Sequence, residues 1–246
     1  PTLLDPFCGS GTICIEAALM ASNTAPGLLK ADSFAFTKLP IHKPELWEKV
    51  KTEAQDAQKE CKCRIIGWDI DPRAVEISNS NAFAADVTDM VEFEVRDFTK
   101  TTREDVPSQT GYIVTDPPYG VRLDSGSAAI RRLYTKMGEV ICQVFSGWSI
   151  AILCGNSELL SFIDLKPNRT NTLFNGGIEC QAAHYYIFSE EERQNMMEKA
   201  KERKSQRLAQ PLSPGAQMAA NRLKKNLATI GEEMKKQGVT SYRLYD

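Results

Sequence analysis

The 246-residue sequence lacks an apolar run of the roughly 20 residues that a membrane-spanning helix needs, so membrane insertion is not expected. It contains only two histidines, His42 and His184, which are too far apart in the sequence to form a metal-ligand pair. A single residue separates Cys61 from Cys63, whereas cysteine pairs in zinc and redox motifs are spaced by two or more. We therefore expect no metal site. The odd number of cysteines, seven, favours a reducing, cytoplasmic compartment.

Two common nucleotide-binding motifs are also missing. Gly9-Ser10-Gly11 begins a G-x-G-x-x-G pattern, but Cys14 stands where the third glycine belongs, which weakens a dinucleotide-binding interpretation. No Gly-Lys-Ser or Gly-Lys-Thr follows, which argues against a P-loop. Gly9 and Gly11 therefore either make a tight turn only or let the backbone approach another charged ligand.

Positive charge is scarce over most of the chain. Residues 1–188 carry 18 Lys and Arg against 24 Asp and Glu, whereas residues 189–226 carry nine against five. A nucleic-acid-binding domain usually presents a basic face. If this body acts on a nucleic acid, we expect it to gain affinity from another module or from a local patch.

The composition predicts three parts. The chain starts at Pro1, in what looks like a core strand, without an initiator methionine or a signal-peptide pattern, so we expect a fragment of a longer protein. After Phe188 the sequence becomes rich in Glu, Lys, Arg, Gln and Met, and a proline-containing break at 211–215 precedes a second charged amphipathic stretch. We predict a folded domain over 1–188, followed by two charged helical stretches that are either part of a linker between modules or solvated helices without a partner.

Within the first part, short β-rich runs alternate with helical patterns, which predicts an α/β fold with a mostly parallel, doubly wound, Rossmann-like sheet. Strands are expected at 2–4, 64–68, 91–95, 112–115 and 150–153, and helices at 12–22, 44–60, 72–85 and 128–145. Asn175-Gly176-Gly177 lies between two further β-rich runs, 169–174 and 179–188, and predicts an antiparallel hairpin that closes the sheet. We expect four aromatic residues in or near the core: Trp68, Phe145, Trp148 and Phe162.

Acidic residues follow four of the predicted strands. In open parallel sheets the ligand lies across the carboxyl ends of the strands, so we expect Asp5, Asp69, Asp97 and Asp116 to converge there. Asp71, followed by proline, is better suited to cap the next helix.

The segment Asp5-Pro6-Phe7-Cys8-Gly9-Ser10-Gly11-Thr12 places an acid and two glycines at a strand-to-helix turn. Such a loop holds the charged amino-acid group of S-adenosylmethionine in Rossmann-like methyltransferases. Asp69 can then accept both hydroxyls of a ribose, and Ile70 can form an apolar wall for the adenine. Asp97 either accepts from the adenine amino group or is an ordinary loop residue, and Cys8 suits a small packing position.

Asp116-Pro117-Pro118-Tyr119 suits an exocyclic base amine. Such an amine is a poor nucleophile because its lone pair is delocalised into the ring. The Asp116 carboxylate and the Pro117 carbonyl can accept its N–H groups and favour a pyramidal nitrogen, while Tyr119 stacks on a base taken out of its helix. The prolines fix this geometry in advance.

Together these motifs resemble the THUMP-linked RNA guanine-N2 methyltransferases, in particular the L half of the bacterial bifunctional 23S rRNA K/L methyltransferases. The resemblance covers nearly the whole chain and rests on the strings at 4–12, 15–18, 25–28, 116–123, 221–227 and 242–246.

The resemblance implies N2-methylation of one guanine in 23S rRNA of an assembling large subunit, with S-adenosylmethionine as cofactor. It also implies an upstream THUMP module and a downstream second methyltransferase module in the full-length protein. Residues 189–217 would then be a charged linker, and residues 218–246 would be the start of the second module. The implied cofactor-binding residues are Asp5, Phe7, Cys8, Gly9, Gly11, Thr12, Asp69, Ile70, Asp97 and Phe98. The implied catalytic residues are Asp116, Pro117, Pro118 and Tyr119.

Three alternatives remain open at this point. The target could be a tRNA guanine. Asp116 stands where many members of the family have Asn, and Asp also suits DNA adenine-N6 methyltransferases. The chain could also be an RNA-binding module without turnover.

Overall fold

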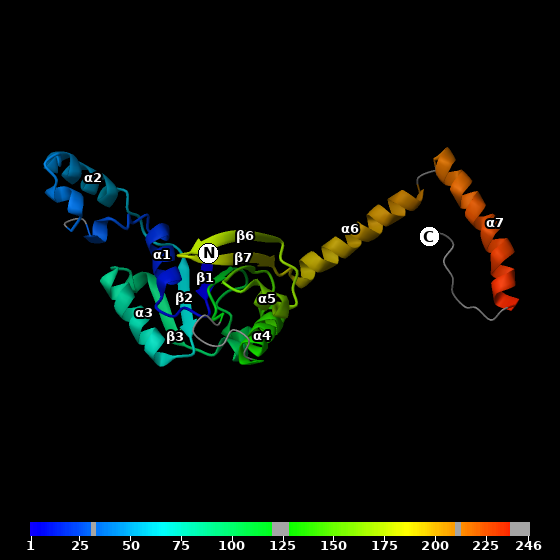
Figure 1. Ribbon diagram of the computed structural model, residues 1–246, viewed down its shortest axis with the longest axis horizontal. Helices are drawn as coiled ribbons and strands as arrows, with labels where there is room; N and C mark the ends of the chain where they lie inside the picture. Colours follow the sequence, from blue (N-terminus) through cyan, green and yellow to red (C-terminus); the bar gives the residue numbers. More distant parts are fainter. Residues whose placement is uncertain (31–32, 120–127, 210–212, 237–246) are drawn as a thin grey trace. The chain divides into compact units, whose positions relative to one another are not determined.

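The computed structural model describes residues 1–30, 33–119, 128–209 and 213–236 (Figure 1). The chain divides into two compact units, Pro1–Glu190 and Glu191–Asp246. One string that carries the family resemblance, 242–246, and the second half of another, 120–123, lie outside the described residues.

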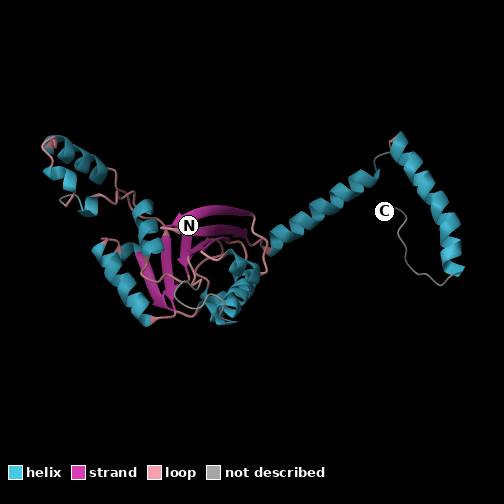
Figure 2. Cartoon of the chain, in the orientation of Figure 1, coloured by secondary structure: helices cyan, strands magenta, loops and turns pink. Residues whose placement is uncertain are grey.

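The first unit is built on a seven-stranded sheet in the order β3-β2-β1-β4-β5-β7-β6 (Figures 1 and 2). The strands are β1 (Thr2–Asp5), β2 (Arg64–Asp69), β3 (Val91–Val95), β4 (Tyr112–Thr115), β5 (Ser149–Cys154), β6 (Arg169–Asn175) and β7 (Ile178–Tyr186). The pairs among β1 to β5 are parallel, whereas β7 runs antiparallel to both β5 and β6. The predicted mostly parallel sheet with a closing antiparallel hairpin is confirmed.

The α-helices are α1 (Thr12–Ala21), α2 (Pro44–Asp56), α3 (Pro72–Ala84), α4 (Ala128–Val144), α5 (Ser157–Leu160), α6 (Glu190–Ala209) and α7 (Pro214–Lys236). Short 3₁₀ helices occupy Leu28–Lys30, Ala35–Lys38, Thr88–Met90, Phe98–Lys100, Arg103–Asp105 and Ser161–Ile163. Asp71 caps α3 by accepting from the Arg73 amide at 2.9 Å, as predicted.

The predicted helix over 44–60 was too long, because α2 ends at Asp56. The Asn23 side chain donates to the Ala57 carbonyl at 2.8 Å, and the Lys59 amide donates to the Ser22 carbonyl at 2.8 Å. These bonds tie the chain after α2 to the end of α1. The helix stops because its next backbone groups have partners elsewhere.

Helices cover both faces of the sheet, and alternate residues of each strand point to opposite faces. Ile66 and Ile113 pack into one core cluster with α4, whereas Ile65 packs into a second cluster with residues of α1 and α3. Figure 2 shows the sheet lying between α3 and α4. Trp68, Phe145 and Trp148 are buried in the α4 cluster and Phe162 packs against it, which confirms the four predicted core aromatics.

The second unit consists of charged helices. Most of α6 and all of α7 belong to it, and Met218, Leu227 and Ile230 of α7 are exposed. Over the described ranges, no helix is both long and apolar enough to cross a membrane.

Candidate functional site

The order of the central strands places the predicted site. β1 lies between β2 and β4 and runs parallel to both, so their carboxyl ends share one edge of the sheet. The strand order reverses at β1, where chain connections leave in opposite directions along the sheet. Ligand crevices of open α/β sheets form at such points.

Asp5 ends β1 and is almost completely buried, with 1% of its surface exposed. Its Oδ1 accepts from the Thr115 hydroxyl at 2.7 Å and from the Phe7 amide at 3.2 Å. Burial raises the pKa of Asp5 from 3.8 to about 7, against the opposing effect of these two bonds. Asp5 therefore connects the turn after β1 to the end of β4 and stays protonated up to near-neutral pH.

The turn after β1 depends on glycine at two positions. Gly9 and Gly11 have φ of +53° and +81°, a region that side-chain-bearing residues rarely adopt. A Cβ on Gly11 would lie 2.8 Å from Cζ of Phe93, so the loop packs closely on β3 there. A Cβ on Gly9 would meet no atom within 4 Å, so open space lies beside the backbone of Gly9.

Asp69 ends β2 and joins the two turns of the site. Its Oδ2 accepts from the Gly9 amide at 3.0 Å, and its Oδ1 accepts from the Asp71 amide at 2.9 Å. These bonds fix the carboxylate while leaving lone pairs for further donors. Ile70, the next residue, is 65% exposed and offers an apolar surface beside the carboxylate.

Asp97 follows β3 and caps a 3₁₀ helix. Hydrogen bonds from the Thr99 hydroxyl at 2.6 Å and amide at 3.0 Å, together with Lys100, lower the pKa of this carboxyl. Phe98 is buried, and its ring lies 5.6 Å from that of Phe7. Any ligand contact of Phe98 must therefore come mainly from its backbone.

Cys8 and Thr12 lie within the same turn. The Cys8 amide donates to the Trp68 carbonyl at 2.8 Å, and burial raises the pKa of its thiol to about 12. A thiol that stays protonated suits packing and not nucleophilic chemistry. Thr12 begins α1, is exposed, and lies within hydrogen-bond distance of the Ser10 hydroxyl at 3.1 Å.

The segment Asp116–Tyr119 leaves β4 at the same edge of the sheet. Pro117 is buried and Pro118 is exposed. Asp116 is half-buried, and desolvation raises the pKa of its carboxyl. Its Oδ1 is inaccessible to solvent and accepts no hydrogen bond from the described residues. This buried acceptor can bind an N–H donor.

Hydrogen bonds connect the turns that carry three of the four acids. Asp5 accepts from Thr115, the residue before Asp116, and Asp69 accepts from Gly9 in the turn after Asp5. The charges of Asp116 and Asp69 also raise the pKa of Asp5. The pKa of Asp97 responds instead to its own local partners. The structure thus forms a central acidic group, Asp5, Asp69 and Asp116, with Asp97 at the end of the next strand.

Two supporting residues were not predicted from the sequence. Thr115 is buried and binds Asp5 across the junction of β4 and β1. Gly155, directly after β5, lies under the ring of Tyr119. Both contacts join residues that are distant in the sequence, so no local pattern reveals them.

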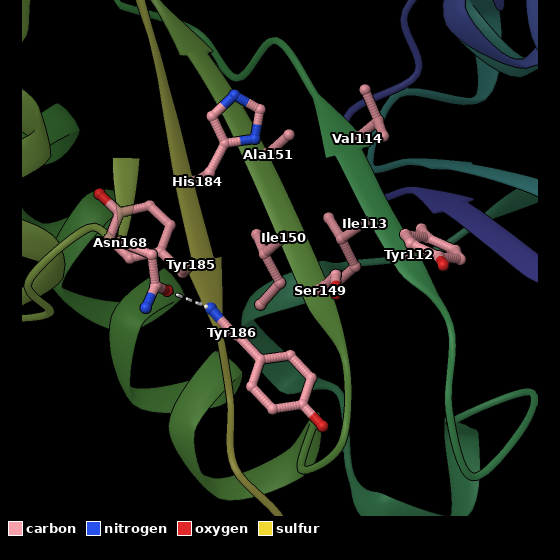
Figure 3. Close-up of a pocket in the computed structure, with 10 residues that line it drawn as sticks. All are labelled: Tyr112, Ile113, Val114, Ser149, Ile150, Ala151, Asn168, His184, Tyr185 and Tyr186. Carbon is pink, nitrogen blue, oxygen red and sulfur yellow. Dashed lines mark hydrogen bonds between the residues drawn. The ribbon is translucent and has the colours of Figure 1, made fainter. Parts of the chain in front are cut away.

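A cavity of about 310 Å³ lies elsewhere, over the face of β4, β5 and β7 (Figure 3). Its lining begins at the first residues of β4 and β5, Tyr112 and Ser149, and includes Tyr186 at the end of β7. Asn168 closes one end, where its Oδ1 accepts from the Tyr186 amide at 2.8 Å. None of the predicted site residues lines this cavity, so it is separate from the acidic group at the strand ends.

Comparison with known proteins gives a consistent assignment. A model of the RMKL-like methyltransferase domain matches residues 1–184. The ribosomal RNA large subunit methyltransferase K/L of Shewanella baltica is 37% identical over 256 residues, which cover 100% of this chain and 33% of that relative. The chain thus spans about a third of the length of the curated relatives it matches.

Two solved structures share the fold and at least 30% of the aligned sequence. SMU.472, crystallised as a complex with SAH, is 31% identical with a TM-score of 0.69, covering 76% of this chain and 48% of that chain. A Listeria monocytogenes protein described as a predicted N6-adenine-specific DNA methylase is 30% identical with a TM-score of 0.66, covering 76% of this chain and 46% of that chain.

Proposed function

The chain belongs to the RMKL-like methyltransferase family, and we propose that it transfers a methyl group to the exocyclic N2 amine of a guanine in 23S rRNA. S-adenosylmethionine is the cofactor of this family and supplies an electrophilic methyl group on a sulfonium. The proposal concerns the amine, the base and the RNA.

The residues at the strand ends fit this cofactor. Open space beside the Gly9 backbone gives the loop room for a ligand. The fixed carboxylate of Asp69 provides acceptors for ribose hydroxyls, and the exposed side chain of Ile70 provides an apolar surface for an adenine. Asp97 would accept from the adenine amino group, although two of its acceptor sites already bind Thr99. Asp5 supports the loop through its hydrogen bond from the Phe7 amide.

The amine-transfer proposal is carried by the buried Oδ1 of Asp116, which has no hydrogen-bond partner among the described residues. A buried acceptor without a donor costs about 1 to 3 kcal/mol, and an amine N–H of the target base would remove that cost. The Pro117 carbonyl would accept the second N–H. Tyr119 would stack on the base and hold the nitrogen in line with the methyl group.

The assignment to rRNA draws on the K/L relative. Residues 1–188 carry an excess of acidic residues, which disfavours unaided RNA binding. We propose that an upstream THUMP module captures the RNA and that residues 218–246 open a second methyltransferase module, joined by a linker over 189–217. In this proposal the protein acts in the cytoplasm on an assembling large subunit.

Nucleoside mass spectrometry tests the proposal. A strain that lacks the gene should lose N2-methylguanosine from 23S rRNA and regain it when the gene is restored. Loss from tRNA would identify a tRNA enzyme, and loss of N6-methyladenine from DNA would favour the activity ascribed to the Listeria relative. An unchanged 23S rRNA profile would refute the proposed substrate.

A further inference from the structure

The ring of Tyr119 lies against backbone that carries no side chain. A Cβ built on Gly155 would be 2.6 Å from Cε2 of Tyr119, 2.9 Å from Cδ2 and 3.2 Å from Cζ. Ordinary contacts of a Cβ begin at about 3.4 Å. The ring can therefore occupy its position only because residue 155 is glycine.

The residues on either side of Gly155 are held in place. β5 pairs with β4 on one edge and with β7 on the other, up to the pair of Cys154 with Gln181. The Cys154 thiol donates to the Asn156 carbonyl at 3.1 Å and lies 3.2 Å from the Tyr134 hydroxyl. Asn156 in turn caps α5 by accepting from the Glu158 amide at 3.1 Å.

A substitution at Gly155 would therefore displace the ring and not the strand. Gly155 does not have a positive φ, so alanine can adopt its backbone conformation. Restoring an ordinary contact with Cε2 requires a movement of about 0.8 Å, the difference between 3.4 and 2.6 Å. The movement falls on the tyrosine, whose ring is the part of the contact that can rotate.

We propose that Gly155 is a positioning residue, which sets the plane of the Tyr119 ring and thereby the width of the slot that receives the target base. This inference rests on the proposed function, because it takes Tyr119 as the stacking platform. In this proposal Gly155 acts only through the ring, which is the group that a Cβ at this position would meet. Misplacing a reacting group by about 1 Å can cost about 100-fold in rate.

The test compares Gly155→Ala with Gly177→Ala, a matched control. Gly177 lies in the turn between β6 and β7, has no positive φ, and would bring a Cβ near no atom within 4 Å. Gly155→Ala in the full-length protein should lower kcat about 10- to 100-fold and leave the affinity for S-adenosylhomocysteine unchanged. Gly177→Ala should match the wild type in both. Equal kcat for the two variants would overturn the proposal.

A second readout measures stacking without turnover. A single-stranded oligonucleotide with one 2-aminopurine, which carries an exocyclic 2-amine, should lose fluorescence when its base stacks on Tyr119. Gly155→Ala should abolish this quenching, as Tyr119→Ala should. If wild-type protein quenches the probe but does not methylate 23S rRNA, the proposed substrate fails while the role of Gly155 stands. Full quenching by Gly155→Ala would refute that role.

The double variant Gly155→Ala with Tyr119→Ala separates ring displacement from damage to the fold. Because it lacks the ring, the added methyl group should no longer clash, and its Tm should equal that of Tyr119→Ala alone. Its kcat should likewise equal that of Tyr119→Ala. A further loss of Tm or of kcat in the double variant would show that Gly155 supports the fold, and would overturn the proposal.

Discussion

Replacing Asp5 by asparagine should change how the stability of the first unit depends on pH. The pKa of Asp5 is about 7 in the folded protein, because burial disfavours its charged form, and is about 3.8 in an unfolded chain. Between these two values the folded state keeps a proton that the unfolded state has lost. The free energy of unfolding must therefore fall as the pH rises from about 4 to about 7, and then level off.

The size of this effect follows from the two pKa values. Their difference, from 3.8 to about 7, corresponds to about 4 kcal/mol at about 1.4 kcal/mol for each pKa unit. Asparagine does not titrate, so the Asp5→Asn variant does not lose this stability as the pH rises. The side-chain amide of the new asparagine buries N–H groups, which lowers the stability of the variant by about 1 to 3 kcal/mol at every pH. The comparison therefore rests on the slope and not on the absolute stability.

Urea unfolding at several pH values between 4 and 8 would measure the effect through tryptophan fluorescence. Trp68 and Trp148 are buried in the first unit and report on its unfolding. The stability of Asp5→Asn relative to the wild type should improve by about 4 kcal/mol between pH 4 and pH 8. Thr115→Val, which removes a hydrogen bond that lowers the pKa of Asp5, should extend the loss to higher pH. A constant difference between wild type and Asp5→Asn would refute the reasoning.

Three further predictions concern the two binding regions and the turn between them. Asp116→Ala should lower kcat by at least about 100-fold with unchanged affinity for S-adenosylhomocysteine by calorimetry, whereas Asp116→Asn should keep activity if the carboxylate acts only as an acceptor. Asp69→Ala should weaken binding of S-adenosylhomocysteine about 10- to 100-fold, because it removes the carboxylate that binds the Gly9 amide. Asp69 is thus assigned to cofactor binding and Asp116 to methyl transfer. Equal losses of binding in Asp69→Ala and Asp116→Ala would contradict this assignment. Gly11→Ala should reduce the free energy of unfolding by about 1 to 3 kcal/mol, because residue 11 has a positive φ and its Cβ would lie too close to Phe93. Urea unfolding measures this loss, with Gly177→Ala as the control. Equal free energies of unfolding for the two variants would contradict the prediction.

The sheet could be predicted from the sequence because its signals are local. Each strand is a short β-rich run, and four runs end at an acid or within two residues of one, so the rule for parallel sheets brings the acids to one edge. The turn Asn175-Gly176-Gly177 likewise gave the hairpin of β6 and β7 without knowledge of the rest of the fold.

Long-range contacts account for what could not be predicted. The end of α2 depends on Asn23, which lies 34 residues from its partner Ala57. The support of Asp5 by Thr115 joins residues 110 positions apart. The sequence does contain a glycine at 155, but its importance appears only when β4 and β5 are paired and Tyr119 is seen to lie on it. Composition and periodicity carry no information on such contacts.

The protonated state of Asp5 explains how two such acids can share one site. Desolvation alone raises the pKa of Asp116, whereas the pKa of Asp5 is raised by deeper burial and also by the charge of Asp116. With a pKa of about 7, Asp5 remains largely protonated below neutral pH. A neutral Asp5 adds little repulsion to the Asp116 carboxylate. In the proposed function Asp116 can then accept from an amine N–H, while Asp5 keeps the structural bonds to Thr115 and Phe7 in either protonation state.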